Sequence, residues 1–202
     1  MLIIGLCGGS GSGKSIVAEY FSKYNVPSID ADAVYRDLLY PGSDLMKKLI
    51  AEFGSDIANE DGKLDRKRLS EIVFSDSGRL AALPKLNAIT HTAIISETEK
   101  RILKLGSLGH KAVIFDAPQL FESNFDKKCD LIIGVGADSE IRLKRIMERD
   151  GISKEAAMRR IGSQLDDDYI RERSDYFLMN NTSKEDLFAN LSEIKDIILK
   201  EI

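Results

Sequence analysis

Apolar residues follow two alternating patterns along this chain. Short, nearly continuous apolar runs are typical of buried parallel strands, and stretches with apolar residues every three or four positions are typical of amphipathic helices. Five runs predict strands, at residues 2–7, 26–29, 111–115, 131–135 and 176–179. A helical pattern follows each run, which predicts an α/β fold with a parallel sheet flanked by crossover helices.

Two intervals interrupt this alternation. Residues 33–107 contain helical patterns at 33–40, 43–53, 66–74 and 77–105, separated by the turn signals Pro41-Gly42 and Asp61-Gly62. Residues 139–173 are helical and densely charged. We therefore predict a core of residues 1–32, 108–138 and 174–202, a helical insertion at 33–107 and a helical lid at 139–173. The last helix, 184–202, places Leu187, Leu191, Ile194 and Ile198 on one face, which should pack on the core.

A glycine-rich loop follows the first predicted strand. Residues 8–15 read GGSGSGKS and fit the phosphate-binding pattern G-x-x-x-x-G-K-[ST]. The glycines allow successive amides to converge on an anion, and the next helix adds its partial positive charge. Lys14 should reach the β- and γ-phosphates, and the Ser15 hydroxyl should bind Mg²⁺. The alternative is a flexible loop that binds nothing. The predicted ATP-binding residues are Gly9, Ser10, Gly11, Ser12, Gly13, Lys14, Ser15 and Ile16.

Carboxylates end two of the predicted strands. Asp30 and Asp32 follow the second strand, and on an extended chain both would project to the same side. We expect Asp32 to be the catalytic base and Asp30 to support position or metal, unless one of them only caps the next helix. Asp116 follows the third strand as a Walker-B acid would, where it would hold Mg²⁺ directly or through water; the alternative is a simple strand exit.

The predicted lid supplies the arginines that phosphoryl transfer needs. Arg142, Arg145 and Arg149 share one helical face, and we expect some of these arginines to reach the transferred phosphate. For most of the arginines a solvated, charged face is the better interpretation. Cys7 and Cys129 are interpreted as small buried residues.

Composition limits the other possibilities. With 29 basic and 33 acidic residues the net charge is −4, which argues against nucleic acid as the main partner. No apolar run reaches the ~18 residues of a membrane span and no leader is visible, so we expect a cytoplasmic protein without a membrane partner. The oligomeric state is left open.

Taken in order, the motifs resemble the dephospho-CoA kinase family, which performs the last step of coenzyme A biosynthesis. They are the loop at 6–15, Ile29-Asp30-Ala31-Asp32, Pro41-Gly42 with Phe53-Gly54, residues 61–66, Leu86-Asn87 with His91, residues 116–122, residues 142–145 with Arg149-Asp150, residues 160–164, and Asp175-Tyr176 leading to Asn180-Asn181. The resemblance implies a P-loop kinase, a transferase whose substrates are ATP and dephospho-CoA and whose cofactor is Mg²⁺.

The resemblance also implies residue roles. Asp32 is similar to the family's base, Lys14 and Arg145 would stabilise the transferred phosphate, and the helical insertion would accept dephospho-CoA. The residues expected to contact the acceptor are Asp30, Arg66, His91 and Gln119. Apart from the resemblance, the position of Asn180-Asn181-Thr182 at a late strand end suggests that they lie near the adenine.

Three residues depart from the family pattern: Ile16 replaces a usual threonine, Thr92 a usual proline and Gln119 a usual leucine. The last two bear on the geometry of the acceptor site. The alternatives to this function are another nucleoside or nucleotide kinase and a non-catalytic nucleotide switch, although the guanine-reading Asn-Lys-x-Asp motif that would favour the switch is absent from the sequence.

Overall fold

The computed structural model describes residues 1–75 and 78–201. The chain divides into two compact units. The first, which we call the core unit, consists of Met1–Ile29 and Lys104–Ile202. The second, the helical unit, is Asp30–Leu103.

A five-stranded sheet has the order β2-β3-β1-β4-β5. Its strands are β1 Leu2–Cys7, β2 Ser28–Asp30, β3 Ala112–Asp116, β4 Leu131–Gly136 and β5 Tyr176–Met179. β1 pairs in parallel with β3 and β4, and β4 pairs in parallel with β5. All five predicted strands are confirmed. The second starts later than predicted, at Ser28.

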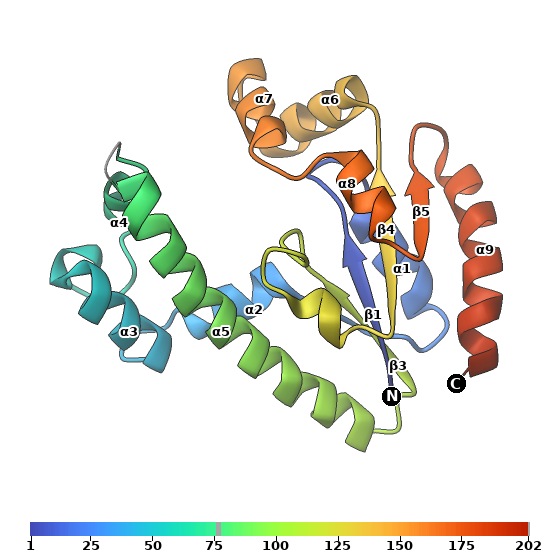
Figure 1. Cartoon of the computed structure of the whole chain (residues 1–202), viewed down its shortest axis with the longest axis horizontal. Helices are drawn as coiled ribbons and strands as arrows, with labels where there is room; N and C mark the ends of the chain where they lie inside the picture. The colour runs from blue at the N-terminus through green and yellow to red at the C-terminus, as the bar shows by residue number, and fades with distance from the viewer. Residues whose placement is uncertain (76–77, 202) are drawn as a thin grey trace. The chain divides into compact units, whose positions relative to one another are not determined.

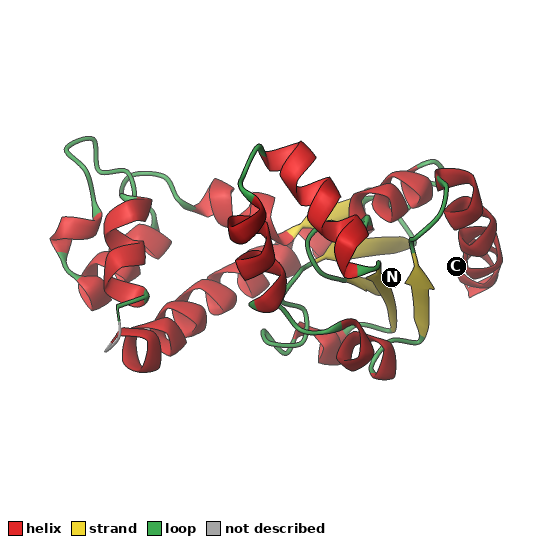
Figure 2. Ribbon diagram, turned by 90° about the horizontal axis from the view of Figure 1, so that it is seen from above, coloured by secondary structure: helices red, strands yellow, loops and turns green. Residues whose placement is uncertain are grey.

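Helices cover both faces of this sheet (Figures 1 and 2). α1 (Lys14–Ser22) and α9 (Lys184–Glu201) pack on one face through a shared hydrophobic core. On the other face α8 (Asp167–Glu172) packs against β4 and β5, and the short helix η2 (Phe125–Lys128) packs against β1. Gly134 lets α8 approach closely, because a Cβ there would lie 2.9 Å from Ile170 Cγ2 and 2.8 Å from Phe177 Cδ2.

The predicted apolar face of α9 is confirmed. Leu187, Leu191, Ile194 and Ile198 are all buried in the same core as Ile4, Leu6 and Val17. The predicted last residue of that helix, Ile202, lies outside the described residues.

The predicted lid interval forms α6 (Ser139–Asp150), α7 (Lys154–Gly162) and α8. α6 and α7 pack against each other, and all three helices belong to the core unit. Asp150, at the end of α6, binds the guanidinium groups of both Arg149 and Arg160. The division of the chain into three functional domains stays a prediction.

The helical unit has its own hydrophobic core. Its elements are α2 (Ala31–Leu38), α3 (Asp44–Phe53), η1 (Ser55–Ile57), α4 (Arg66–Val73) and most of α5 (Gly78–Ser107). The fully or nearly buried core side chains are Leu45, Leu49, Ile57, Leu69 and Val73. Ser43 and Asp65 cap the N-termini of α3 and α4 by accepting backbone hydrogen bonds. The predicted first residue of the long helix, Ser77, lies outside the described residues.

None of the helices within residues 1–75 and 78–201 is both long enough and apolar enough to cross a membrane.

A phosphate loop as the candidate functional site

The glycine-rich loop connects β1 to α1 and contains backbone conformations that favour glycine. Gly8 has φ 151° and Gly13, the N-cap of α1, has φ 102°. A Cβ at Gly8 would collide with the carbonyl oxygen of Val135, and one at Gly13 would collide with the Asn180 amide. At these two positions the loop therefore lies against its neighbours with no room for a side chain.

Every carbonyl of residues 8–13 accepts a hydrogen bond from the protein. Backbone amides supply two of these bonds, from Ser12 to Gly9 and from Ile16 to Gly13. Side chains supply the other four, namely Lys14 Nζ to Gly8 (2.8 Å), Arg142 Nε to Ser10 (2.9 Å), Arg145 Nη1 to Gly11 (3.2 Å) and Asn180 Nδ2 to Ser12 (2.7 Å). The negative ends of these peptide dipoles are thus all engaged by donors.

Several amides of the loop remain available for a ligand. Within the part of the chain that the structure describes, the N–H groups of residues 9, 11, 13, 14 and 15 donate to no protein acceptor. The last two belong to the first turn of α1, whose amides have no partner within the helix. Free amides, bound carbonyls and a helix N-terminus are the features that an anion-binding site requires. Nucleotide binding by this loop stays a prediction.

Oxygen donors suited to magnesium adjoin this loop. Ser15 is exposed in the first turn of α1, and Asp116 ends β3 directly opposite Leu6 of β1, two residues before Gly8. Among the described residues, no group of three or more His, Cys, Asp or Glu side chains could hold a metal ion. Mg²⁺ commonly keeps several waters and binds through one or two protein oxygens plus substrate phosphates, so this pair fits it. Magnesium binding by Ser15 and Asp116 stays a prediction.

The lid arginines Arg142 and Arg145 differ in burial, although their spacing places them on the same helical face. Arg145 is half-buried and donates to the Gly11 carbonyl, so its guanidinium lies at the loop. Arg142 is only 4% exposed and donates to the Ser10 carbonyl, which corrects its interpretation as part of a solvated face. Burial lowers the pKa of Arg142, although the charge of Asp167 opposes this. The periodicity that groups the two arginines could not tell which is buried.

Asn180 also holds the phosphate loop, a role that the sequence did not predict. It directly follows β5, is 3% exposed and donates a hydrogen bond of 2.7 Å to the Ser12 carbonyl. Its position after a strand end was the only available signal, and an adenine contact stays a prediction. Cys7 is buried as predicted, whereas Cys129 is only partly buried. Burial raises the pKa of each thiol to about 12.

The predicted extended conformation through Asp30 and Asp32 is wrong. β2 ends at Asp30, whose carboxylate caps α2 by accepting from the Asp32 amide at 2.9 Å. Asp30 also pairs with Arg36 at 3.7 Å. Asp32 lies in the first helical turn, where its side chain does not follow the alternation of a strand. The capping alternative is therefore confirmed for Asp30, and Asp32 is exposed.

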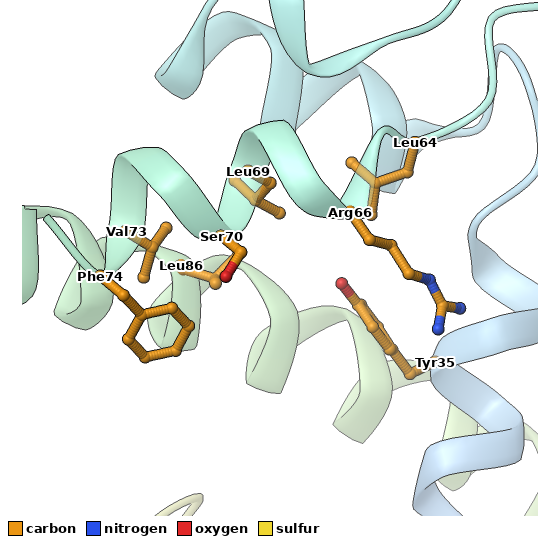
Figure 3. A pocket seen from close by; sticks show the side chains of 8 residues that line it. All are labelled: Tyr35, Leu64, Arg66, Leu69, Ser70, Val73, Phe74 and Leu86. Atoms are coloured by element: carbon orange, nitrogen blue, oxygen red, sulfur yellow. The ribbon is translucent and has the colours of Figure 1, made fainter. Parts of the chain in front are cut away.

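A pocket of about 170 Å³ lies within the helical unit (Figure 3). Arg66, at the start of α4, and Tyr35, on α2, lie at one end of it. Burial raises the pKa of Tyr35, and the nearby charge of Arg66 opposes this shift. The remaining lining residues are Leu64, Leu69, Ser70, Val73, Phe74 and Leu86. The pocket is thus apolar with a cation and a hydroxyl at one end.

Three of the four predicted acceptor residues belong to the helical unit, and the fourth, Gln119, belongs to the core unit. Arg66 lines the pocket, but Asp30 and His91, in the same unit, do not. His91 is half-buried on α5. Gln119 is exposed in the turn after β3 of the core unit. Their contact with an acceptor stays a prediction.

The known proteins to which the chain is similar include dephospho-CoA kinases from several organisms. The dephospho-CoA kinase from Corynebacterium glutamicum is 39% identical over 202 residues, which is 100% of both chains. The dephospho-CoA kinase from Arabidopsis thaliana is 40% identical over 96% of this chain and 82% of its own length. The solved structure of the dephospho-CoA kinase from Campylobacter jejuni superimposes with a TM-score of 0.69 at 27% identity, covering 98% of each chain. The profile of the dephospho-CoA kinase family matches residues 2–186, and the chain belongs to that family.

Proposed function

We propose that this protein transfers the γ-phosphoryl group of ATP to the ribose 3′-hydroxyl of dephospho-CoA, giving coenzyme A and ADP. The observation that carries the proposal is the phosphate loop, whose carbonyls are bound, in part by two arginines, while the amides of residues 9, 11, 13, 14 and 15 have no acceptor among the described residues. This loop lies in a chain of the dephospho-CoA kinase family. A loop built in this way suits the polyphosphate of a nucleotide.

In the proposed reaction the acceptor oxygen attacks the γ-phosphorus while the bond to the β–γ bridging oxygen breaks. Asp32 takes the proton of the hydroxyl, and ADP leaves with the bond electrons. Lys14 and Arg145 exchange their carbonyl partners, Gly8 and Gly11, for phosphate oxygens on which charge develops. Mg²⁺, when bound through Ser15 and Asp116, would neutralise phosphate charge.

We assign the acceptor to the helical unit, with contacts from Asp30, Arg66 and His91 and a further contact from Gln119. The pocket beside Arg66 supports this assignment. Its apolar wall suits the apolar segments of dephospho-CoA, and its single cation suits a phosphate group of the same molecule. Action in the cytoplasm stays a prediction.

The deciding experiment measures ADP release with MgATP and dephospho-CoA, and coenzyme A by mass. Nucleosides and nucleoside monophosphates are tested in parallel as acceptors. We expect ADP formation to depend on dephospho-CoA and coenzyme A to appear in equal amount. ATP binding without that dependence, or faster turnover of a nucleoside, would contradict the proposal and point first to Thr92 and Gln119.

A further inference from the structure

The peptide groups of Ser10 are bound on both sides by residues of the lid interval. The Ser10 N–H donates to Gln164 Oε1 at 2.9 Å, and its carbonyl accepts from Arg142 Nε at 2.9 Å. Gln164 Oε1 also accepts from Arg142 Nη2 at 3.0 Å. The three residues therefore form a closed ring of hydrogen bonds. Figure 1 shows the linker between α7 and α8, which carries Gln164, passing beside the loop that follows β1.

Asp167 connects this ring to the sheet. Its Oδ1 lies 3.5 Å from Arg142 Nη1, and its Oδ2 accepts from the Ala137 amide at 3.1 Å, directly after β4. The carboxylate thus fixes the far side of the same guanidinium. Three of the Arg142 nitrogens are engaged, each by a different residue.

The ring acts on the part of the loop that is freest to rotate. Ser10 is flanked by Gly9 and Gly11, whose peptides lack the restraint that a Cβ provides. Arg142 also packs directly on Gly9, where a Cβ would collide with its guanidinium. Holding both groups of the Ser10 peptide therefore fixes the direction of the neighbouring amides, which are among those available to phosphate.

We propose that Gln164 and Asp167 are positioning residues for nucleotide binding: acting through Arg142 and the Ser10 peptide, they hold the phosphate loop with its amides directed at the nucleotide. The proposal rests on the proposed function only in that the loop binds a nucleotide. Neither residue contacts phosphate in it. Loss of the Gln164 acceptor would leave two donors unsatisfied and release the Ser10 peptide.

The test compares Gln164→Leu, which removes the acceptor, with Gln164→Glu, which retains an oxygen for both donors. MgADP affinity is measured by titration, so that turnover of an acceptor is not required. We expect Gln164→Leu to weaken MgADP binding by about tenfold or more, and Gln164→Glu to bind within about threefold of wild type. In the ADP-release assay the KM for ATP should rise in Gln164→Leu while the KM for dephospho-CoA stays unchanged.

Asp167→Asn provides a second variant, because asparagine retains an oxygen for Ala137 but loses the charge beside Arg142. Like Gln164→Leu, this variant should bind MgADP more weakly than wild type. Each variant has a matched neighbour as control: Ser163→Ala in the same linker, whose hydroxyl bonds to the Arg160 carbonyl, and Asp168→Asn, whose side chain is 93% exposed. Both controls should bind MgADP as wild type does.

Hydrogen exchange of the peptide covering residues 8–13 gives a measurement independent of affinity. In the folded, nucleotide-free protein this peptide should exchange faster in Gln164→Leu than in wild type and Gln164→Glu. Unchanged MgADP affinity in Gln164→Leu, unchanged exchange, or equal damage by Gln164→Glu would each overturn the proposal. Turnover of a different acceptor by the wild-type protein would instead contradict the proposed function and leave this result standing.

Discussion

Asp32 is exposed in the first turn of α2, and its carboxylate is not used to cap that helix because Asp30 already does so. An exposed carboxylate beside a helix start is available to accept a proton. Asp32→Asn should reduce kcat by about 10²- to 10⁴-fold, the range usual for loss of a general base, and leave MgADP affinity unchanged. Asp37→Asn, on the same helix, should retain turnover because Asp37 pairs with Arg101 at 2.9 Å on the surface. Undiminished turnover by Asp32→Asn would remove Asp32 from the mechanism.

The two thiols give a prediction about reactivity. Because burial raises the pKa of Cys7 and Cys129 to about 12, only roughly one thiol in ten thousand is ionised at pH 8, and the thiolate is the reactive form. Iodoacetamide at pH 8 should therefore leave the native protein unmodified and alkylate both cysteines in urea. Intact mass measures the outcome. Rapid alkylation of the native protein would contradict the burial of these thiols.

At the scale of single residues, the sequence identified the loop but not what holds it. The loop motif is a local property, because glycine conformations and the following helix are determined within a few residues. Arg142, Gln164 and Asn180 reach the loop from positions more than 130 residues away in the chain. Their contacts depend on how the helices pack, which helical periodicity alone does not specify.

At the scale of elements, continuous apolar runs predicted β1, β3 and β4, because a strand buried on both faces has no polar alternation to obscure it. The prediction was wrong where a polar residue ends an element. The sequence at Asp30 and Asp32 fitted a continued strand as well as a helix cap. In the structure the side chain of Asp30 caps α2, so the helix starts earlier than the apolar pattern indicated.

The junction after α6 carries a pH-dependent prediction. Hydrogen bonds from Arg149 and then Arg160 lower the pKa of Asp150 from 3.8 to about 2. A lowered pKa in the folded state stabilises the protein above the unfolded value, and this stabilisation is lost as the pH falls toward about 2. Asp150→Asn should therefore lower the Tm at pH 7, and the difference from wild type should narrow as the pH falls from about 5 to about 3.

Glu148→Gln is the matched control on the same helix. Glu148 only approaches Lys144, at 4.0 Å, with both side chains largely exposed, so its loss should change the Tm little at either pH. A Tm difference for Asp150→Asn that stays constant between pH 7 and pH 3 would mean that the charge of Asp150 does not stabilise this junction.

At the scale of the whole molecule, the sequence predicted that helices interrupt a nucleotide-binding core. The strand order and the division into two compact units required the structure, because both depend on contacts between segments far apart in the chain. The phosphate loop and all the side chains that hold it belong to the core unit, whereas Asp32 and the pocket beside Arg66 belong to the helical unit. The residues proposed for the reaction thus belong to two units with separate hydrophobic cores.

This division predicts in which unit each substrate should slow hydrogen exchange. MgADP alone should slow hydrogen exchange in residues 8–16 of the core unit, because its phosphates bind the free amides of the loop. Dephospho-CoA alone should slow exchange in the helical unit, around Tyr35 and Arg66, where the pocket lies. Exchange measured by mass spectrometry on the wild-type protein, with coenzyme A as a second acceptor-like ligand, separates the two effects. Protection by dephospho-CoA confined to residues 8–16 would mean that the acceptor competes for the nucleotide site, and the helical unit would lose its proposed role.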